Sequence, residues 1–237
     1  AYKPDNTLDY TQSNFQYYAS GDIRSFDQEN ADGSSQVTQL EDGTGHVVTV
    51  TAYKPDNTLD YTQSNFQYYA SGDIRSFEQE NADGSSQVTQ LEDGTGHALT
   101  VTAYKINGEL NYTQSNFQYD SAGDLRSFHQ VNADGSSQNT TMQAGGERVD
   151  TVTAYKPNGD LNYTQNNFQY DGAGDLASFR QTNADGSYQI TDMQAGGERV
   201  DTVTAYKNGG ALDYTQSNFQ YDGAGDLASF RQTNADG

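Results

Sequence analysis

The sequence predicts an all-β protein made of tandem repeats, because three observations agree. A passage that begins Ala-Tyr-Lys recurs every 51 residues, and a period of this size is typical of architectures whose units pack against their neighbours. Clusters rich in Gly, Asn and Asp, which form turns, return about every dozen residues. The runs between these clusters are rich in Tyr, Phe, Val and Thr, which favour strands.

The period sets the boundaries of the repeats. Four complete copies cover residues 1–51, 52–102, 103–153 and 154–204, and a partial fifth copy covers 205–237; they are numbered repeat 1 to repeat 5. Repeats 1 and 2 differ at only three positions, Asp27/Glu78, Val47/Ala98 and Val48/Leu99. Such close copies indicate recent duplication and a tolerance of changes in length.

Each repeat is expected to hold about four antiparallel strands joined as a meander. In repeat 1 the strand-like runs are Leu8–Tyr17, Ile23–Gln28, Ser35–Leu40 and His46–Tyr53. The turn clusters are Lys3–Asn6, Ala19–Asp22, Asn30–Gly33 and Glu41–Gly45. Gly, Asn and Asp supply the positive φ angles of tight hairpin turns. Some apolar residues are three apart, as in a helix, but the short runs and frequent turns favour strands.

The first strand of the repeat carries a change of phase. Leu8 and Tyr10 alternate in one phase, and Phe15 and Tyr17 alternate in the other. An extra residue in a strand produces such a shift. The sequence therefore predicts a β-bulge near Ser13-Asn14.

Comparison of the copies indicates which positions face inward. Position 50 is Val in every complete copy and is expected to be buried, whereas Val48 becomes Leu and then Asp and is expected to be solvated. Among the residues that recur in all five copies are Leu8, Tyr10, Phe15, Tyr17 and Phe26. These five are expected to form inward-facing ladders that stabilise a thin, otherwise polar sheet.

Two architectures fit four strands in 51 residues. One is an extended curved sheet or β-solenoid-like array, and the alternative is a five-bladed β-propeller. A closed ring needs whole repeats, and the fifth copy has only 33 residues. The count therefore favours the open array.

Charge excludes two classes of partner. The formal net charge is −21, with 12 Lys and Arg against 33 Asp and Glu. Lys and Arg supply the affinity of proteins for nucleic-acid phosphates and for anionic membranes. We therefore expect no nucleic acid as a partner and, because no run of 18 apolar residues occurs, no insertion into a membrane.

Composition also bears on order and location. An apolar content of 32% with high net charge would ordinarily favour disorder, but 12% aromatic residues and only 3 Pro oppose it. The chain has no Cys, which excludes disulfides, thiolate metal sites and Cys nucleophiles. Acidity and repetition together favour an extracellular or cell-surface location.

One passage resembles a known family. The stretch Tyr170–Phe179, with Tyr-Asp, two small residues, Gly, a polar residue and Leu, is similar to the YD repeat of bacterial RHS and wall-associated proteins. Tyr221–Leu227 repeats the motif and Tyr119–Leu125 is close to it. The resemblance implies extracellular β-hairpin repeats that wind into a large curved sheet or shell. It implies no catalytic residue.

Catalysis is not expected. The three His residues, His46, His97 and His129, are replaced by other residues in the equivalent positions of other copies, which indicates solvated surface. No nucleophile elbow or fixed base accompanies the many Ser and Asp residues. We therefore expect a protein that is not an enzyme and that has no obligatory cofactor.

Paired carboxylates in the turns are candidates for weak Ca²⁺ binding. Asp171 and Asp175, and likewise Asp222 and Asp226, bracket Gly-rich loops. Ca²⁺ takes six to eight oxygen ligands, and each loop offers two carboxylates at most. The alternative is that these Asp side chains bond to their own backbone as turn formers.

A polar and aromatic stretch is a candidate surface for sugar. Tyr10, Gln12 and Asn14 in repeat 1, and Tyr61, Gln63 and Asn65 in repeat 2, combine rings that stack on pyranoses with amides that bond hydroxyls. The alternative is that the Tyr residues pack in the sheet while Gln and Asn form cross-strand ladders.

These observations favour a structural or adhesive repeat segment of a long bacterial extracellular or cell-surface protein, such as a stalk, filament, matrix or shell. The alternative function is a multivalent carbohydrate-binding module. Expected partners are further copies, through sheet edges or flanking repeats, and a polysaccharide.

Overall fold

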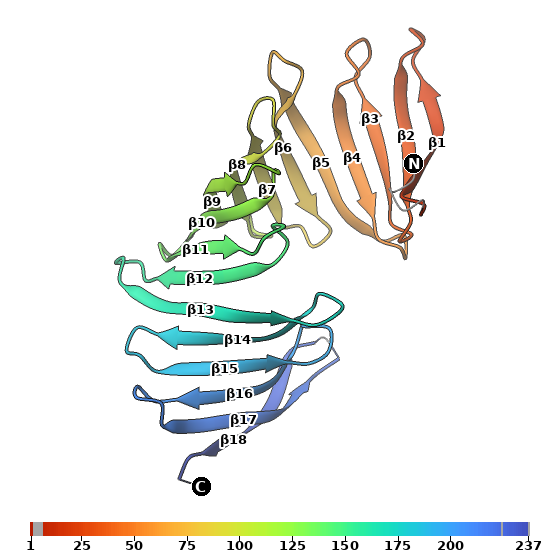
Figure 1. Ribbon diagram of the computed structural model, residues 1–237. Coiled ribbons are helices and arrows are strands. Elements are labelled where there is room, and N and C mark those ends of the chain that lie inside the picture. Colours follow the sequence, from red (N-terminus) through yellow and green to blue (C-terminus); the bar gives the residue numbers. More distant parts are fainter. Residues whose placement is uncertain (2–6, 224, 237) are drawn as a thin grey trace. The chain divides into compact units, whose positions relative to one another are not determined.

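The computed structural model describes residues 1, 7–223 and 225–236 (Figure 1). Regular structure in these residues is entirely β-strand, and none of them is helical. The first predicted turn cluster, Lys3–Asn6, lies outside the described residues. The chain divides into two compact units, Ala1–Ser115 and Asn116–Gly237, and each is described by itself.

Strands follow one another with short turns in both units. The first unit holds β1 (Tyr10–Tyr17), β2 (Ile23–Asn30), β3 (Ser35–Leu40), β4 (Val47–Tyr53), β5 (Leu59–Tyr68), β6 (Ile74–Asn81), β7 (Ser86–Leu91), β8 (Ala98–Tyr104) and the start of β9 (Leu110–Tyr119). The second unit holds the end of β9, then β10 (Leu125–Asn132), β11 (Ser137–Met142), β12 (Val149–Tyr155), β13 (Leu161–Tyr170), β14 (Leu176–Asn183), β15 (Tyr188–Met193), β16 (Val200–Tyr206), β17 (Leu212–Tyr221) and β18 (Leu227–Asn234).

Each unit is an antiparallel meander in which consecutive strands pair. The pairing crosses the repeat boundaries, because Ala52, the first residue of repeat 2, lies in β4 opposite Tyr61 of β5. The pairs β12–β13 and β16–β17 cross their boundaries in the same register. A propeller would hold each group of four strands as a separate blade. The propeller alternative is therefore wrong, and the expected open antiparallel sheet is confirmed.

Among the described residues the core of each unit is thin, because the contacts between strands join neighbours in the sheet and no second layer covers it. Buried positions hold small residues that fall in the third and fourth strands of each repeat. They are Thr38, Thr89, Thr140 and Thr191, with Ala52, Ala103, Ala154 and Ala205, and also Val203. A single layer has few places for large apolar side chains, which accounts for the low apolar content of the chain.

The predicted bulge is confirmed. The pairing of β1 with β2 slips between Ser13 and Gln16, and Asn14 in the slip has a φ of 53°. The equivalent residues Asn65, Asn116, Asn167 and Asn218 have φ values of 54–56°. Asn tolerates this left-handed conformation better than most side chains, which explains why the position is Asn in every copy.

The expectation that Leu8 faces inward is wrong, and the equivalent Leu59 shows the reason. Leu59 is 42% exposed, close to the 41% of Leu8. Tyr61 lies opposite Ala52, but the register then slips at Asp60, so Leu59 lies opposite Tyr53. Because neighbouring residues of a strand point to opposite faces, this second bulge moves the Leu to the face away from Ala52.

The expectation for position 48 agrees with the structure, and the expected burial at position 50 is complete only at Val203. Val48 and Leu99 are 46% and 45% exposed, and Asp150 and Asp201 are also exposed. The Val residues of position 50 are half-buried in three copies, and Val203 is 8% exposed.

Candidate binding surfaces

Five pairs of Phe rings stabilise the first hairpin of each repeat. The bulge at Asn65 brings Phe66 of β5 to the same face as Phe77 of β6, and their ring centroids lie 5.6 Å apart. The other pairs, at centroid distances of 5.5–5.7 Å, are Phe15–Phe26, Phe117–Phe128, Phe168–Phe179 and Phe219–Phe230. Each offset stack adds about 0.5–1.5 kcal/mol to the area that it buries. The expected aromatic ladders are thus pairs confined to single hairpins.

Amide side chains form cross-strand ladders beside these rings. Gln63 donates from Nε2 to Oε1 of Gln79 at 3.1 Å, Gln79 donates to Asn81 at 2.9 Å, and Asn81 donates to Ser85 Oγ at 3.0 Å. In repeat 1, Gln12 donates to Gln28 at 3.2 Å. The ladder arrangement that the sequence left open as an alternative is therefore present.

The candidate sugar platform is divided between the two faces of the sheet. Tyr61 and Gln63 lie two residues apart on the face of Ala52, but the amide of Asn65 donates to Oε2 of Glu78 at 2.6 Å. Asn14 of repeat 1 donates to Asp27 in the same way at 2.7 Å. Tyr10 and Tyr61 are half-buried. Sugar binding at Tyr10, Gln12 and Asn14, or at their repeat 2 equivalents, stays a prediction.

The paired turn carboxylates bond to their own backbone. Oδ1 of Asp171 accepts the N–H groups of Ala173 at 2.8 Å and Asp175 at 3.0 Å, and the N–H of Asp226 donates to Asp222 at 2.9 Å. This is the turn-forming arrangement. Among the described residues no group of three or more His, Asp or Glu side chains could hold a metal ion. Ca²⁺ binding at these turns also stays a prediction.

A second set of Asp residues closes the turns between the second and third strands. Oδ1 of Asp83 accepts both the N–H of Ser85 at 2.8 Å and its hydroxyl at 2.6 Å. These hydrogen bonds stabilise the carboxylate, the hydroxyl bond most, and lower the pKa of Asp83 below its ordinary value. Asp134 and Asp185 have the same partners in Ser136 and Ser187, and their pKa values are lowered for the same reason.

His46 is not the solvated side chain that its variation among copies predicts. Its ring stacks on Tyr68, with centroids 3.8 Å apart and planes 9° apart, and only a third of the side chain is exposed. The Tyr68 hydroxyl donates to the Val47 carbonyl at 2.8 Å, and burial raises the pKa of Tyr68. The stack joins the end of repeat 1 to the first hairpin of repeat 2.

Arg takes the place of His in the second unit. The guanidinium carbons of Arg148 and Arg199 each lie 5.1 Å from the ring centroids of Tyr170 and Tyr221. His and Arg share a flat, polar group that stacks on Tyr. That shared property was the signal in the sequence for a contact between repeats. His129 is also half-buried, and its Nδ1 bonds with Asn139 at 2.7 Å.

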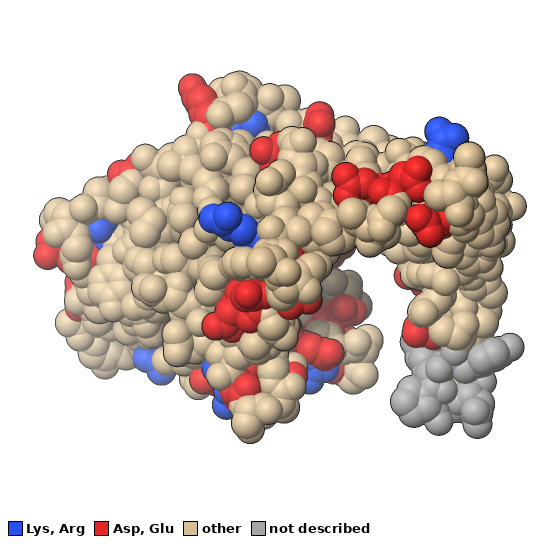
Figure 2. Space-filling view, turned by 90° about the horizontal axis from the view of Figure 1, so that it is seen from above, with Lys and Arg blue, Asp and Glu red and all other residues tan. Residues whose placement is uncertain are grey.

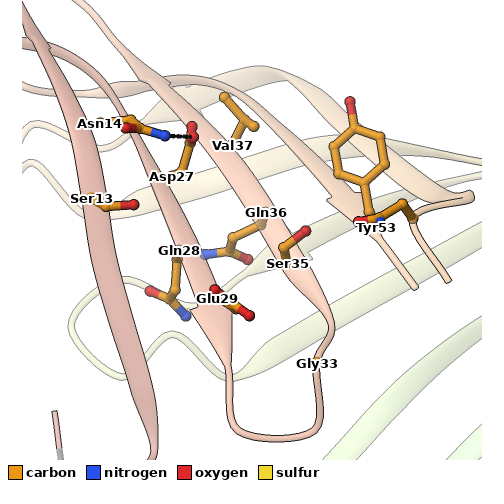
Figure 3. A pocket seen from close by; sticks show the side chains of 11 residues that line it. Ser13, Asn14, Asp27, Gln28, Glu29, Gly33, Ser35, Gln36, Val37 and Tyr53 are labelled. Atoms are coloured by element: carbon orange, nitrogen blue, oxygen red, sulfur yellow. Dashed lines mark hydrogen bonds between the residues drawn. The ribbon is translucent and has the colours of Figure 1, made fainter. Parts of the chain in front are cut away.

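A groove opens on the other face of repeats 1 and 2. In repeat 1 a row of directly opposite residues crosses three strands, with Glu29 on β2, Ser35 on β3 and Tyr53 on β4 (Figure 3). Ser35 is small, so a space of about 440 Å³ remains between the carboxylate and the ring. In repeat 2 the row is Glu80, Ser86 and Tyr104, and the space is about 360 Å³. We name these two spaces the serine grooves.

The same row is filled in repeat 4. It consists of Thr182, Tyr188 and Tyr206, and the Tyr188 ring stacks on Tyr206 with centroids 4.6 Å apart. The guanidinium carbon of Arg180 lies 3.8 Å from the centroid of Tyr188. Nε of Arg180 is buried and makes no hydrogen bond within the described part of the chain, so stacking on the ring holds the guanidinium.

Negative charge dominates the accessible surface. Figure 2 shows Asp and Glu side chains spread over the face in view, with Lys and Arg as isolated points. Such a field favours cationic ligands near any groove that also offers specific contacts. The part of the chain that the structure describes contains no helix able to cross a bilayer.

No family and no characterised protein sequence matches the chain. Among solved structures, the chain is similar over 93% of its length to a chain of the TcdB2–TccC3–Cdc42 crystal structure, at 16% identity and a TM-score of 0.34. It is similar over 97% to the Photorhabdus luminescens Tc holotoxin pore, at 13% identity and a TM-score of 0.29. It spans only 12% and 15% of those two chains.

A third similar structure is a porin-like protein from Bacteroides uniformis. The match covers 89% of this chain and 84% of that one, at 10% identity and a TM-score of 0.25. The hairpins that the resemblance to YD repeats implies are present in the structure itself, as where Tyr170 and Leu176 pair on either side of a Gly-rich turn.

Proposed function

We propose that this chain is a non-enzymatic structural segment of a bacterial extracellular or cell-surface protein, and that it serves as a stalk, filament, matrix or shell element. The observation that carries the proposal is the unbroken strand pairing across repeat boundaries, as between β4 and β5. The last strand of each repeat pairs with the first strand of the next repeat. A further copy can therefore extend the sheet through the same kind of strand pairing.

Contacts between repeats support the same role. The stack of His46 on Tyr68 links repeat 1 to repeat 2, and those of Arg148 on Tyr170 and of Arg199 on Tyr221 link repeat 3 to repeat 4 and repeat 4 to repeat 5. Side chains in these positions have structural partners in the neighbouring repeat. Self-association through sheet edges or flanking repeats belongs to the proposal, as does the absence of a cofactor.

Insertion of a further copy of residues 52–102 after residue 102 tests the proposal. The lengthened protein is expected to stay soluble, to keep the same β-sheet circular dichroism per residue and to unfold at no lower temperature than the parent, because repeat arrays gain a unit and an interface together. Insertion of the same residues in scrambled order is the control and is expected to destabilise the protein.

Two results would contradict the proposal. One is loss of folding on insertion of the intact copy, which would show that the number of repeats is fixed by a closed structure. The other is turnover, proportional to protein concentration, of any member of a broad panel of polysaccharide and peptide substrates.

A further inference from the structure

The place that is open in each serine groove is filled by a side chain at the equivalent position of repeat 4. Strand registers are equivalent in the repeats, so Tyr188 of repeat 4 stands where Ser35 and Ser86 stand in repeats 1 and 2. The Tyr188 ring fills the space above the middle strand and stacks on Tyr206, which corresponds to Tyr53 and Tyr104. Repeat 4 thus shows that the strand register leaves room for a six-membered ring at this position.

Charge changes sign at the same place. Arg180 covers the ring in repeat 4, and the equivalent residues of repeats 1 and 2 are Asp27 and Glu78. The position of Thr182 is likewise Glu29 in repeat 1 and Glu80 in repeat 2. Where repeat 4 supplies both a ring and a cation, repeats 1 and 2 supply carboxylates and leave the place of the ring open.

One carboxylate in each groove is available to a ligand. Asp27 and Glu78 already accept the amides of Asn14 and Asn65, at 2.7 and 2.6 Å. Glu29 and Glu80 are exposed, and within the described chain no hydrogen bond or ion pair engages them (Figure 3 for repeat 1).

Apart from Val37, the remaining lining is polar, and it suits a sugar better than an aromatic side chain. Ser13, Ser35 and Gln36 line the groove of repeat 1 together with Tyr53. A pyranose offers hydroxyls to these groups while its flat face stacks on the Tyr ring. An aromatic ring would leave the hydroxyls and amides without partners, which lowers affinity.

We propose that each serine groove binds one ring of an amino sugar, so that repeats 1 and 2 hold neighbouring parts of one cationic polysaccharide built from 2-amino-hexose units. The ring stacks on Tyr53 or Tyr104, and its ammonium group pairs with Glu29 or Glu80. Two grooves on one chain let a polymer bind both, which raises the overall affinity above that of either groove. Of the predicted sugar platform, Tyr10 and Gln12 do not line this groove, and Asn14 lines it with its amide bonded to Asp27. The proposal does not depend on the structural role.

The test is calorimetric titration of the full chain with a short β-1,4-linked glucosamine oligosaccharide, at low salt and about pH 6, where primary amines are protonated. The N-acetylated oligosaccharide, which has no ammonium groups, is the ligand control. Binding of the amine form at least about tenfold tighter than the acetylated form is expected, because the ion pair is lost on acetylation. Equal affinity for both forms would overturn the proposal.

Substitutions separate the grooves from the general negative field. The pair Glu29→Gln and Glu80→Gln is expected to weaken binding about tenfold, whereas Glu147→Gln with Glu198→Gln, an equal change of charge at exposed turns, leaves it nearly unchanged. Equal weakening by both pairs would show attraction to net charge alone and would overturn the proposal.

A substitution that changes no charge gives the sharpest result. Ser35→Tyr with Ser86→Tyr copies the residue of repeat 4, where the fold accepts it, and is expected to fill both grooves and abolish binding while the unfolding temperature is unchanged. Unaltered binding by this variant would overturn the proposal. Tighter binding of a peptide rich in Arg and Tyr than of the glucosamine oligosaccharide would also overturn it and would assign the grooves to a protein partner.

Discussion

In each complete repeat the turn after the first strand lies beside the turn after the third strand. Side-chain hydrogen bonds join these two turns in repeats 1 and 2, whereas close backbone packing joins them in repeats 3 and 4. In repeat 1, Ser20 donates to Asp42 at 2.6 Å and the N–H of Gly43 donates to Asp22 at 3.2 Å, and repeat 2 has the same bonds. In repeat 3 the backbone of Gly146 lies so close to Leu125 that a Cβ would be 2.8 Å from its nitrogen. Gly197 is equally close to Leu176 in repeat 4.

The register of the sheet is the same in all these repeats, while groups of contacts within them are replaced together. Position 44 is Thr in repeats 1 and 2 and Gly in repeats 3 and 4, and position 20 changes from Ser to Ala in the same copies. His46 likewise gives way to Arg148 and Arg199, whereas Ser35 is kept as Ser137 in repeat 3 and becomes Tyr188 in repeat 4. Because each repeat contacts mainly its neighbours, one copy can change a whole set of contacts without disturbing distant copies.

The largest loss of stability is expected from a substitution that disrupts the close approach of Gly146 to the backbone of Leu125. Gly146→Ala places a Cβ against the backbone of Leu125 at a φ of +72°, so both strain and a clash result. We expect a loss of about 3 kcal/mol in the free energy of unfolding, measured by urea denaturation.

Gly145→Ala is the matched control, because its φ of +91° is also strained but no atom lies within 4 Å of the added Cβ. A loss of roughly 1–2 kcal/mol is expected from the strain alone. If the two variants lose the same stability, close approach is not what joins these hairpins.

A smaller loss of stability is expected from substitutions that remove the ring stacks of His46 and of Arg148. Tyr68→Leu removes both the stack on His46 and the hydrogen bond to Val47, and about 2 kcal/mol of stability is expected to be lost. Tyr68→Phe keeps the stack and is expected to lose about 1 kcal/mol.

The same pair of substitutions at Tyr170, which stacks with Arg148 and donates to Val149 at 3.1 Å, sharpens the comparison. Similar losses in thermal and urea unfolding would show that His and Arg are interchangeable here. A much smaller loss for Tyr170→Leu would show that the Arg stack contributes little.

The smallest effect concerns a feature that both units share. Folding lowers the pKa values of Asp83, Asp134 and Asp185, so their contribution to stability is complete above the unfolded value and is lost as the pH falls through the folded values, below about pH 4. Replacement of all three by Asn, which keeps the acceptor oxygen but not the charge, is expected to make the urea midpoint fall less steeply between neutral and acidic pH. If the urea midpoint of the triple variant falls with pH as steeply as that of the parent, the three carboxylates do not contribute to stability in this way.

Local features of the fold followed from the sequence. The turns were predictable from Gly, Asn and Asp, and the bulge from the change of phase between Tyr10 and Phe15, because both depend on residues close together in the chain. The face of Leu8 was not predictable, since a second bulge at Asp60, seen only in the register of β4 with β5, reverses it.

Candidate sites were harder to predict, because they too depend on the register between strands that are distant in the sequence. Variation of His46 among copies suggested a solvated residue, but its partner Tyr68 lies 22 residues away on a strand of the next repeat. The serine grooves combine Glu29, Ser35 and Tyr53 from three strands, and each of these residues alone looks like ordinary sheet surface.

By itself the sequence determined the period of 51 residues, the strands, the turns and the first bulge, because hydrogen bonds within a turn and alternation along a strand act over a few residues. Tertiary structure decided which side chains share a face, which rings stack between repeats and where a groove stays open. These depend on the register between strands, and one slipped residue moves every following side chain to the opposite face of a single-layer sheet.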